Sequence, residues 1–277
     1  MIYENELLKM KILIYFHQNE ASVCTVGKIA DRLGSFKQKI SKMLIILEEE
    51  GLVNRNDNRH PQLTKKGTIL ADKYTTKMKM TTEVLIQAGV SLEMVDHDAY
   101  NIVMGSSQST IDAIKRRFMK LELKKELRGK GNFNGDLVSK ILYDGMYPIN
   151  FVIYKQNADY NNNLSMANNG FEHPAHIFVE NGSGIVKLRI KDLRSRVPYK
   201  DDLVEGHAAE VQYLYKGEYA KAEILGSFLT FPLDAVQFVT MGDDSNVQIQ
   251  GSLFMKIKST INTTYMPESE AIFTIVM

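Results

Sequence analysis

The sequence predicts an α+β protein with an N-terminal winged helix-turn-helix, a helical dimerisation segment and a mostly β C-terminal domain, built as an antiparallel sheet or a sandwich. Three observations predict this fold class. Apolar residues recur at helical spacing up to about residue 65, helix-forming residues continue to about residue 125, and β-branched and aromatic residues alternate after about residue 148. The expected domains are residues 1–75, 76–127 and 128–277.

The first two helices are predicted from apolar stripes. The first stripe consists of Leu7, Leu8, Ile12, Ile14, Tyr15 and Phe16, and the second of Val26, Ile29, Ala30 and Leu33. Thr25 is a suitable N-cap for the second helix, and Gly34 is expected to end it. A short turn then leads to a third helix, as in a helix-turn-helix.

The surface chemistry of the third helix changes along its length. Ile40, Leu44 and Leu47 are expected to face inward, with Met43 as a further candidate. The outward residues contain no carboxylate until residues 48–50, which are all glutamate. Lysines suit phosphates, whereas amide and hydroxyl groups suit base edges. The predicted DNA contacts of this segment are Ser35, Lys37, Gln38, Lys39, Ser41 and Lys42.

A short hairpin, the wing, is predicted after this helix. Residues 52–53 and 62–63 form two short apolar runs, and NRNDNRHP between them is rich in turn residues. Arg55, Arg59 and His60 are expected on this wing as further DNA contacts. A helix with three lysines is by itself more often a solvated surface. The helix-turn-helix, EEEGLV and the basic hairpin together favour DNA binding.

These motifs make the chain resemble a known protein family. IADRLG, EEEGLV and LTKKGTILADKY are similar to the winged-helix half of bacterial repressors, and the helices that follow, with Val95 and Ala99 in a V-x-x-x-A pattern, narrow the resemblance to iron- or manganese-dependent regulators of the diphtheria toxin repressor type. The resemblance covers residues 1 to about 125. It implies a dimeric, metal-regulated transcription factor that binds double-stranded DNA.

The resemblance also implies a regulatory metal site, and here the chain departs from the pattern. Where the family has a Cys-x-x-Glu-His or Glu-x-x-Glu-His cluster, this chain has Tyr100, Val103 and Met104. The expected histidine falls near Met78, and the first-helix donor near Lys9 or Met10. Such side chains do not replace carboxylate and imidazole ligands for manganese or iron. We therefore expect that the metal switch is lost and that no cofactor is bound.

Nearby donors offer one alternative metal site, from residue 96 to residue 98. Asp96 is more simply explained as a helix N-cap, and His97 and Asp98 as exposed polar residues.

Residues 68–125 contain more helix than a winged helix needs for its own core. We expect these helices to form a homodimer interface, which would place two recognition helices one turn apart on a palindromic operator. The alternative is an intramolecular bundle packed against the C-terminal domain. Residues 128–135, RGKGNFNG, predict the boundary that follows.

The C-terminal domain is expected to be mostly antiparallel β. The predicted strands are PINFVIYKQ, AHIFVE, GIVKLRIKDL, AAEVQYLY, AVQFVTM, NVQIQGSLFMKIKST and EAIFTIVM. Helices are expected near residues 136–143 and, as an option, near residues 219–225. This domain is predicted to sense a small-molecule effector or to mediate oligomerisation. Glu172, His173 and His176 are weak zinc-ligand candidates, with His207 more distant, and loop histidines without a metal are the favoured reading.

Composition limits the remaining function classes. Residues 1–80 contain fourteen Lys and Arg against nine Asp and Glu, so the net charge of +1 divides into +5 for this part and −4 for the rest. The basic part is the predicted DNA-binding part. A lone Cys24 excludes intramolecular disulfides, and no signal peptide or membrane span is visible, so a cytoplasmic protein is expected.

No phosphate-binding glycine loop, G-x-S-x-G, H-E-x-x-H or paired-carboxylate pattern is present, so an enzyme is not expected. Two classes remain. The first is a transcription regulator, either repressor or activator. The second is a ligand-binding protein or an enzyme whose β domain acts and whose winged helix mediates protein contacts.

Overall fold

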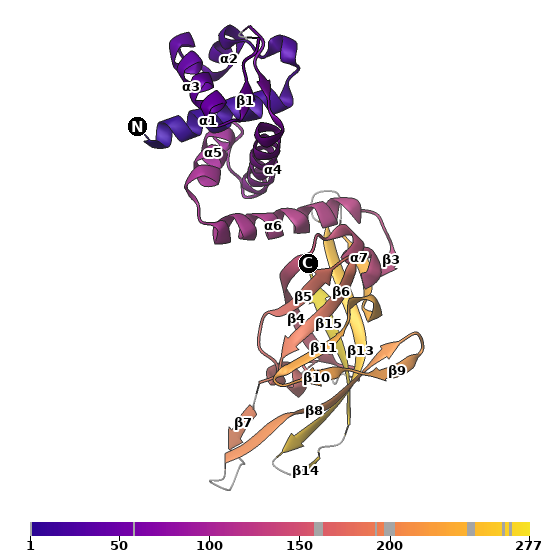
Figure 1. The fold of residues 1–277 in the computed structure, drawn as a ribbon. Helices are drawn as coiled ribbons and strands as arrows, with labels where there is room; N and C mark the ends of the chain where they lie inside the picture. The colour runs from indigo at the N-terminus through magenta and orange to yellow at the C-terminus, as the bar shows by residue number, and fades with distance from the viewer. Residues whose placement is uncertain are drawn as a thin grey trace. The chain divides into compact units, whose positions relative to one another are not determined.

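The computed structural model describes residues 2–57, 59–157, 163–191, 193–196, 203–242, 247–261, 264–265 and 268–277. The chain divides into two compact units, residues 1–118 and 119–277. Figure 1 shows the helical first unit in indigo to magenta and the strand-rich second unit in magenta through orange to yellow. The division falls inside helix α6, so the last part of the predicted dimerisation segment, residues 119–127, belongs with the second unit.

The first unit contains the predicted winged helix-turn-helix. Its elements are α1 (Ile2–Gln18), η1 (Ala21–Val23), α2 (Val26–Leu33), α3 (Lys37–Glu49), β1 (Val53–Asn54), β2 (Gln62–Leu63), α4 (Lys65–Gln87), α5 (Val95–Gly105) and the start of α6 (Gln108–Glu126). The strands β1 and β2 pair antiparallel as the wing. The helix between residues 68 and 125 that the sequence predicts is thus present as three separate helices.

One hydrophobic core joins α1, α2, α3, the wing and α4. Its members include Leu8, Ile12, Leu13, Phe16, Ile29, Ile40, Met43, Leu44, Leu47 and Ala71. All four apolar positions predicted to face inward on α3 are buried. At about 25 cal/mol per Å² of apolar surface removed from water, each such side chain stabilises the unit by about 1.5–3 kcal/mol. This burial on one side of α3 leaves its other side for solvent.

The second unit is a folded antiparallel sheet with the short helix α7, preceded by the last part of α6. Its elements are β3 (Asn132–Asn134), α7 (Gly135–Ile141), β4 (Gly145–Lys155), η2 (Met166–Gly170), β5 (Ala175–Glu180), β6 (Ser183–Arg189), β7 (Leu193–Arg196), β8 (Leu203–Tyr215), β9 (Glu218–Lys221), β10 (Glu223–Leu225), β11 (Phe228–Pro232), η3 (Leu233–Ala235), β12 (Gln237–Met241), β13 (Gln248–Ile261), β14 (Thr264–Tyr265) and β15 (Ser269–Val276). The segments predicted as strands all contain one, and the helix predicted near residue 136 is α7.

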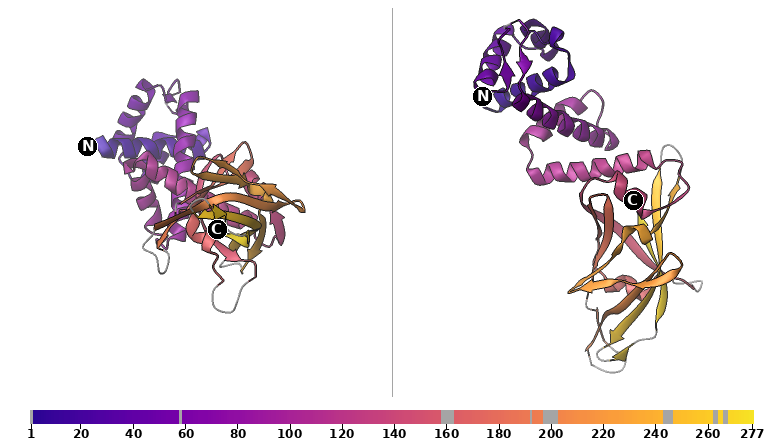
Figure 2. Two further views of the ribbon diagram at one scale, coloured as in Figure 1. Left: turned by 90° about the horizontal axis from the view of Figure 1, so that it is seen from below. Right: turned by 45° about the vertical axis from the view of Figure 1, so that its right-hand side comes forward.

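The sheet order runs β10-β11-β6-β5-β4-β15-β13-β12-β3, and β8 pairs with β13, β7 and β9. Residues 145–149 of β4 pair with β5, whereas residues 150–155 pair with β15, so β4 belongs to both halves. The rings of Phe231 on β11 and Phe273 on β15 lie 5.5 Å apart, although three strands separate β11 from β15 in the order. The sheet therefore folds over on itself as a sandwich, and Figure 2 shows this unit from two further sides.

The optional helix predicted near residues 219–225 is wrong. Residues 219–225 form parts of β9 and β10, not a helix. The reason lies in the preceding turn, because Lys216 and Gly217 both have positive φ and fold β9 back onto β8 in a two-residue hairpin. Cross-strand pairing then decides the conformation of residues 218–221, which have no strong strand preference of their own.

Candidate nucleic-acid interface

The turn between α2 and α3 is set by local sequence. The Thr25 side chain accepts a hydrogen bond from the Lys28 amide at 3.4 Å, as an N-cap does. Gly34 adopts the left-handed conformation after α2, with φ of 58°, and its amide bonds back to the helix. Phe36 is the N-cap of α3 and makes no side-chain capping bond. The three residues 34–36 thus reverse the chain and present the start of α3 outward.

The outward face of α3 is basic and amide-bearing. Lys37, Gln38, Lys39 and Lys42 are exposed, whereas Ser41 is half-buried, as is Ser35 in the turn. The first turn of α3 contains no acidic residue. In the part of the chain that the structure describes, no ion pair joins a carboxylate to Lys37, Lys39 or Lys42. The partial positive charge of the helix N-terminus adds to these lysines, so this surface attracts phosphate.

The carboxylates at the far end of α3 are partly neutralised. Glu48 lies 3.5 Å from Arg55, and the Glu50 carboxylate pairs with Lys9 of α1. The Lys66 ammonium also donates to the Glu50 carbonyl at 2.9 Å. These contacts connect α3 to α1, β1 and α4, and they remove part of the charge that would repel a nucleic acid.

The three predicted wing contacts differ in their placement. Arg59 is exposed, but the Arg55 side chain is only 18% exposed because it packs beside Glu48. His60 is half-buried, and its Nδ1 atom is buried with no hydrogen-bond partner among the described residues. Side-chain oxygens of Asn54 and Asp57 accept backbone amide bonds at 2.8 Å and order the wing tip. Arg59 is therefore the wing residue best placed to reach a ligand.

Sequence reasoning missed one exposed residue of this surface. Phe36 has 82% of its surface exposed, directly between Ser35 and Lys37. An aromatic residue is usually expected in the core, so its exposure could not be predicted from the periodicity of α3. At the start of a helix that enters the major groove, such a ring can contact the methyl group of thymine.

The positions that the family resemblance assigns to a metal form a hydrophobic cluster. Met10 and Val103 are buried there with Ile14, and Met78, Tyr100 and Met104 pack against them. Burial raises the pKa of the Tyr100 hydroxyl, with a further contribution from Asp96. The Tyr100 hydroxyl therefore keeps its proton at neutral pH. These residues do not fit a divalent metal, because they supply thioether and aliphatic groups in place of ionised ligands.

The metal candidates of α5 lie on its surface. His97 contacts the Asp98 carboxylate at 3.1 Å and is exposed. The sequence predicted Asp96 as the N-cap, and this is wrong, because α5 begins at Val95 after the cap residue Met94. Asp96 instead lies in the first turn, where a carboxylate complements the helix dipole.

The candidate zinc ligands of the second unit point to different partners. The His173 ring stacks on Phe151 with centroids 4.1 Å apart, and Glu172 lies 3.5 Å from Arg189. His176 is half-buried on β5, and the side chain of His207 lies outside the described residues. Within the described part of the chain, no group of three or more His, Cys, Asp or Glu residues could hold a metal ion.

No family model matches the chain, and no curated protein does. Among solved structures, the chain is similar to T. acidophilum IdeR, at 16% identity over 73% of this chain and 91% of that one, with a TM-score of 0.34. It is similar to the manganese regulator SloR at 12% identity over 82% and 97%, with a TM-score of 0.33. A third is the heme-bound NEAT5 domain of IsdX2, a B. anthracis hemophore, at 17% identity over 47% and 94%, with a TM-score of 0.29.

Among the described residues, no helix combines the length and the apolar character needed to cross a membrane.

Proposed function

We propose that this chain is a DNA-binding transcription regulator that reads double-stranded DNA through α3. The observation that carries the proposal is the division of α3 into two sides. Ile40, Leu44 and Leu47 are fully buried on one side, while the exposed residues of the first half of the helix, from Lys37 to Lys42, supply lysine and amide groups and no carboxylate; Glu48 and Glu49 come only at the far end. A rigid helix that projects cations and an amide suits a major groove lined by phosphates.

Each group on this surface has a distinct role in the proposal. Lys39 and Lys42 contact phosphates and supply affinity that depends on salt. Gln38 contacts a base edge through its amide, which can both donate and accept. Phe36 contacts a thymine methyl group, and Arg59 on the wing contacts the backbone outside the groove.

The regulator is proposed to act as a homodimer on a palindromic operator. The loop between α4 and α5 exposes Leu92 and Met94, and Ile86 near the end of α4 is partly exposed as well. Apolar groups on the helical segment that follows the wing favour a contact with a second copy. A two-fold dimer would place two copies of α3 about one turn of DNA apart, near 34 Å.

We propose that this chain lacks the metal switch of the family that it resembles. The cluster around Met10 and Val103 fills the space between α1, α4 and α5 with apolar groups. A packed cluster holds these helices together without a ligand, so DNA affinity is expected not to require a divalent metal.

The test is a fluorescence anisotropy titration of the full chain against double-stranded DNA at two salt concentrations, first with a random pool and then with sequences selected from it. The double variant Lys39→Ala/Lys42→Ala should bind more weakly, and its slope of log affinity against log salt should fall by about 0.9 for each phosphate contact removed. Lys130→Ala/Lys191→Ala is the matched control, because both residues are exposed in the second unit and the charge change is identical.

Binding that is lost in the first variant and kept in the control supports the proposal. Equal binding by both variants, or binding of the wild-type chain that does not change with salt, would refute it. The remaining candidate, a protein that acts through its β domain, would then be favoured.

A further inference from the structure

One groove in the second unit arises from a break in strand pairing. On one edge of β13, residues 248–252 pair with β12 and residues 255–261 pair with β8. Leu253 and Phe254 pair on that edge with neither of these two strands in the described chain. Strands β8 and β12 therefore diverge at this point. Backbone N–H and C=O groups that pair with no neighbouring strand need other hydrogen-bond partners. A cavity of about 380 Å³ lies at the fork, a volume suited to a small molecule.

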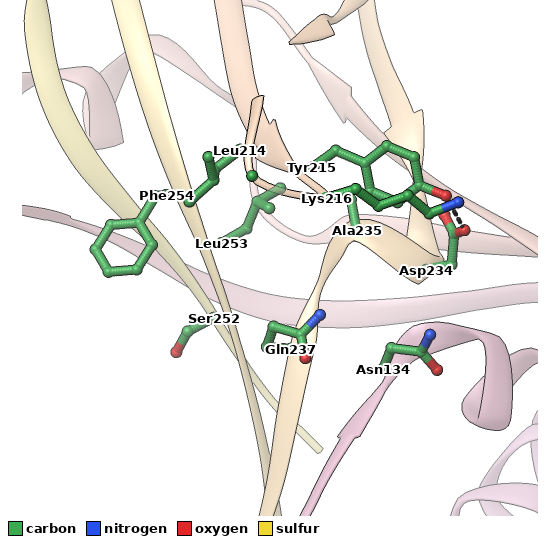
Figure 3. A pocket seen from close by; sticks show the side chains of 11 residues that line it. Asn134, Leu214, Tyr215, Lys216, Asp234, Ala235, Gln237, Ser252, Leu253 and Phe254 are labelled. Carbon is green, nitrogen blue, oxygen red and sulfur yellow. Dashed lines mark hydrogen bonds between the residues drawn. The ribbon is translucent and has the colours of Figure 1, made fainter. Parts of the chain in front are cut away.

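One end of the groove is charged. The Tyr215 hydroxyl donates to the Asp234 carboxylate at 2.6 Å, and the Lys216 ammonium lies 4.8 Å from the centre of the Tyr215 ring. Figure 3 shows the three side chains gathered at this end of the groove. The hydrogen bond with Tyr215 and the charge of Asp234 hold the pKa of Lys216 above its ordinary value, so the ammonium is charged at neutral pH. A carboxylate accepts several hydrogen bonds, so Asp234 can accept more than the one from Tyr215.

The remainder of the groove is apolar with polar edges. Leu214, Ala235 and Leu253 lie between the charged end and Phe254 (Figure 3). Leu253 is buried and Phe254 is 42% exposed, as expected for successive residues of a strand, whose side chains point to opposite faces. The polar lining residues are Asn134, Gln237 and Ser252. These groups come from β3, β8, η3, β12 and β13, so the fold brings together residues that are far apart in the sequence.

The backbone at Lys216 is unusual for its residue type. Lys216 and Gly217 are the two central residues of the β8–β9 turn, with φ of 51° and 90°. The turn between β5 and β6 has the same form, with φ of 50° at Asn181 and 74° at Gly182. Asn-Gly is the preferred pair for such a turn, whereas lysine rarely adopts a positive φ. A lysine kept in a position that favours asparagine indicates a role for its ammonium group, because local rules are most often broken at functional sites.

We propose that this groove binds a small zwitterion of the amino-acid class, with its carboxylate on Lys216, its ammonium on Asp234 and its apolar side chain along the apolar lining of the groove. A neighbouring cation and anion match the two charged groups of an amino acid, which are bonded to the same α-carbon. Binding to this groove does not depend on DNA binding by α3, so the two proposals can fail separately. If both hold, the ligand is an effector of the regulator.

The experiment uses the full chain and the proteinogenic amino acids, each added singly at about 10 mM, which detects dissociation constants up to the millimolar range. Thermal denaturation selects the amino acids that raise the midpoint, since a ligand of the folded state stabilises it. Calorimetric titration then measures affinity for the best of them. The corresponding amine without the carboxylate and the corresponding acid without the ammonium are titrated in parallel.

Lys216→Asn distinguishes a binding role from a structural one. Asparagine suits the turn, so this variant should keep or raise the thermal midpoint and yet bind the amino acid at least about tenfold more weakly. Asn181→Lys is the matched control, which should lower the midpoint and leave affinity unchanged. Saturable binding of an amino acid that needs both charges and Lys216 supports the proposal. Binding by no amino acid, equal binding by Lys216→Asn, or equal binding of an analogue that lacks one charge would overturn it.

Discussion

The guanidinium of Arg55 on the wing side of β1 lies 3.5 Å from the carboxylate of Glu48 in the last turn of α3. This ion pair connects the two elements that are proposed to contact DNA. It also keeps Arg55 mostly out of solvent, while the Glu48 side chain is 45% exposed. A surface pair of this kind contributes at most about 1 kcal/mol to stability, so its main effect is on where the charges lie.

The first prediction follows from that pair. Glu48→Gln removes a negative charge from the end of α3 and releases Arg55 toward phosphate. We expect DNA affinity at low salt to rise by roughly twofold to tenfold, with little change in stability. Anisotropy titrations at two salt concentrations measure the gain. Glu126→Gln is the control, since Glu126 is exposed at the end of α6 and carries the same charge. A loss of affinity in Glu48→Gln would mean that Glu48 holds Arg55 in the binding geometry.

The second prediction concerns the close approach of α4 to the wing. A β-carbon at Gly67 would lie 1.9 Å from the Leu52 carbonyl oxygen, and that carbonyl accepts a bond from the Thr64 amide at 3.0 Å. Gly67→Ala must therefore move the backbone, and we expect it to destabilise the first unit by more than about 2 kcal/mol. Chemical denaturation monitored by circular dichroism measures this loss.

Gly105→Ala is the contrasting variant for that experiment. Nothing lies within 4 Å of a β-carbon at Gly105, which ends α5 without a positive φ. Alanine there should be neutral or stabilising by up to about 1 kcal/mol, since glycine disfavours helix. Equal denaturation midpoints for the two variants would contradict the close contact at Gly67.

Much of the first unit could be predicted from the sequence because its signals are local. Thr25 and Gly34 define the ends of α2 through bonds within a few residues, and the inward positions of α3 follow from helical periodicity. The exposure of Phe36 could not be predicted, because hydrophobic character alone places such a ring in the core. The ion pair of Arg55 with Glu48 could not be predicted either, because it depends on how the wing packs on α3.

For the second unit, less of the structure could be predicted from the sequence. Alternation predicts its long strands, but FLTFP at residues 228–232 is short and ends in proline, so β11 was missed. The groove at the fork of β13 combines five elements, and no spacing in the sequence indicates that Asp234 lies beside Tyr215. Such sites are decided by sheet register, which a single sequence does not reveal.

The third prediction tests the hydrophobic cluster in place of a metal site. Met10 is fully buried in it, so Met10→Ala should destabilise the chain by about 2–5 kcal/mol. Met166→Ala, at a residue that is 79% exposed, should change stability by less than about 0.5 kcal/mol. Chelator or added manganese should leave the stability and the DNA affinity of the wild-type chain unchanged. An affinity gain of about tenfold or more on adding manganese would show that a metal site exists elsewhere in the chain.

The fourth prediction concerns Cys24 and alkaline pH. Burial raises the pKa of the Cys24 thiol above its ordinary value of 9.0, and the thiol donates to the Glu20 carbonyl at 3.3 Å. The folded chain should therefore react with iodoacetamide at pH 8 at least about 100-fold more slowly than the denatured chain. Burial likewise raises the pKa of Tyr74 and Tyr100.

Because these three groups bind their protons more tightly when folded, their contribution to stability is complete below about pH 9 and is lost as the pH rises through the folded pKa values. Thermal midpoints should therefore fall above about pH 9, and mass spectrometry of the alkylated chain should show Cys24 becoming reactive over the same range. Equal alkylation rates for folded and denatured chain at pH 8 would show that Cys24 is open to solvent, which its burial beside α2 does not allow.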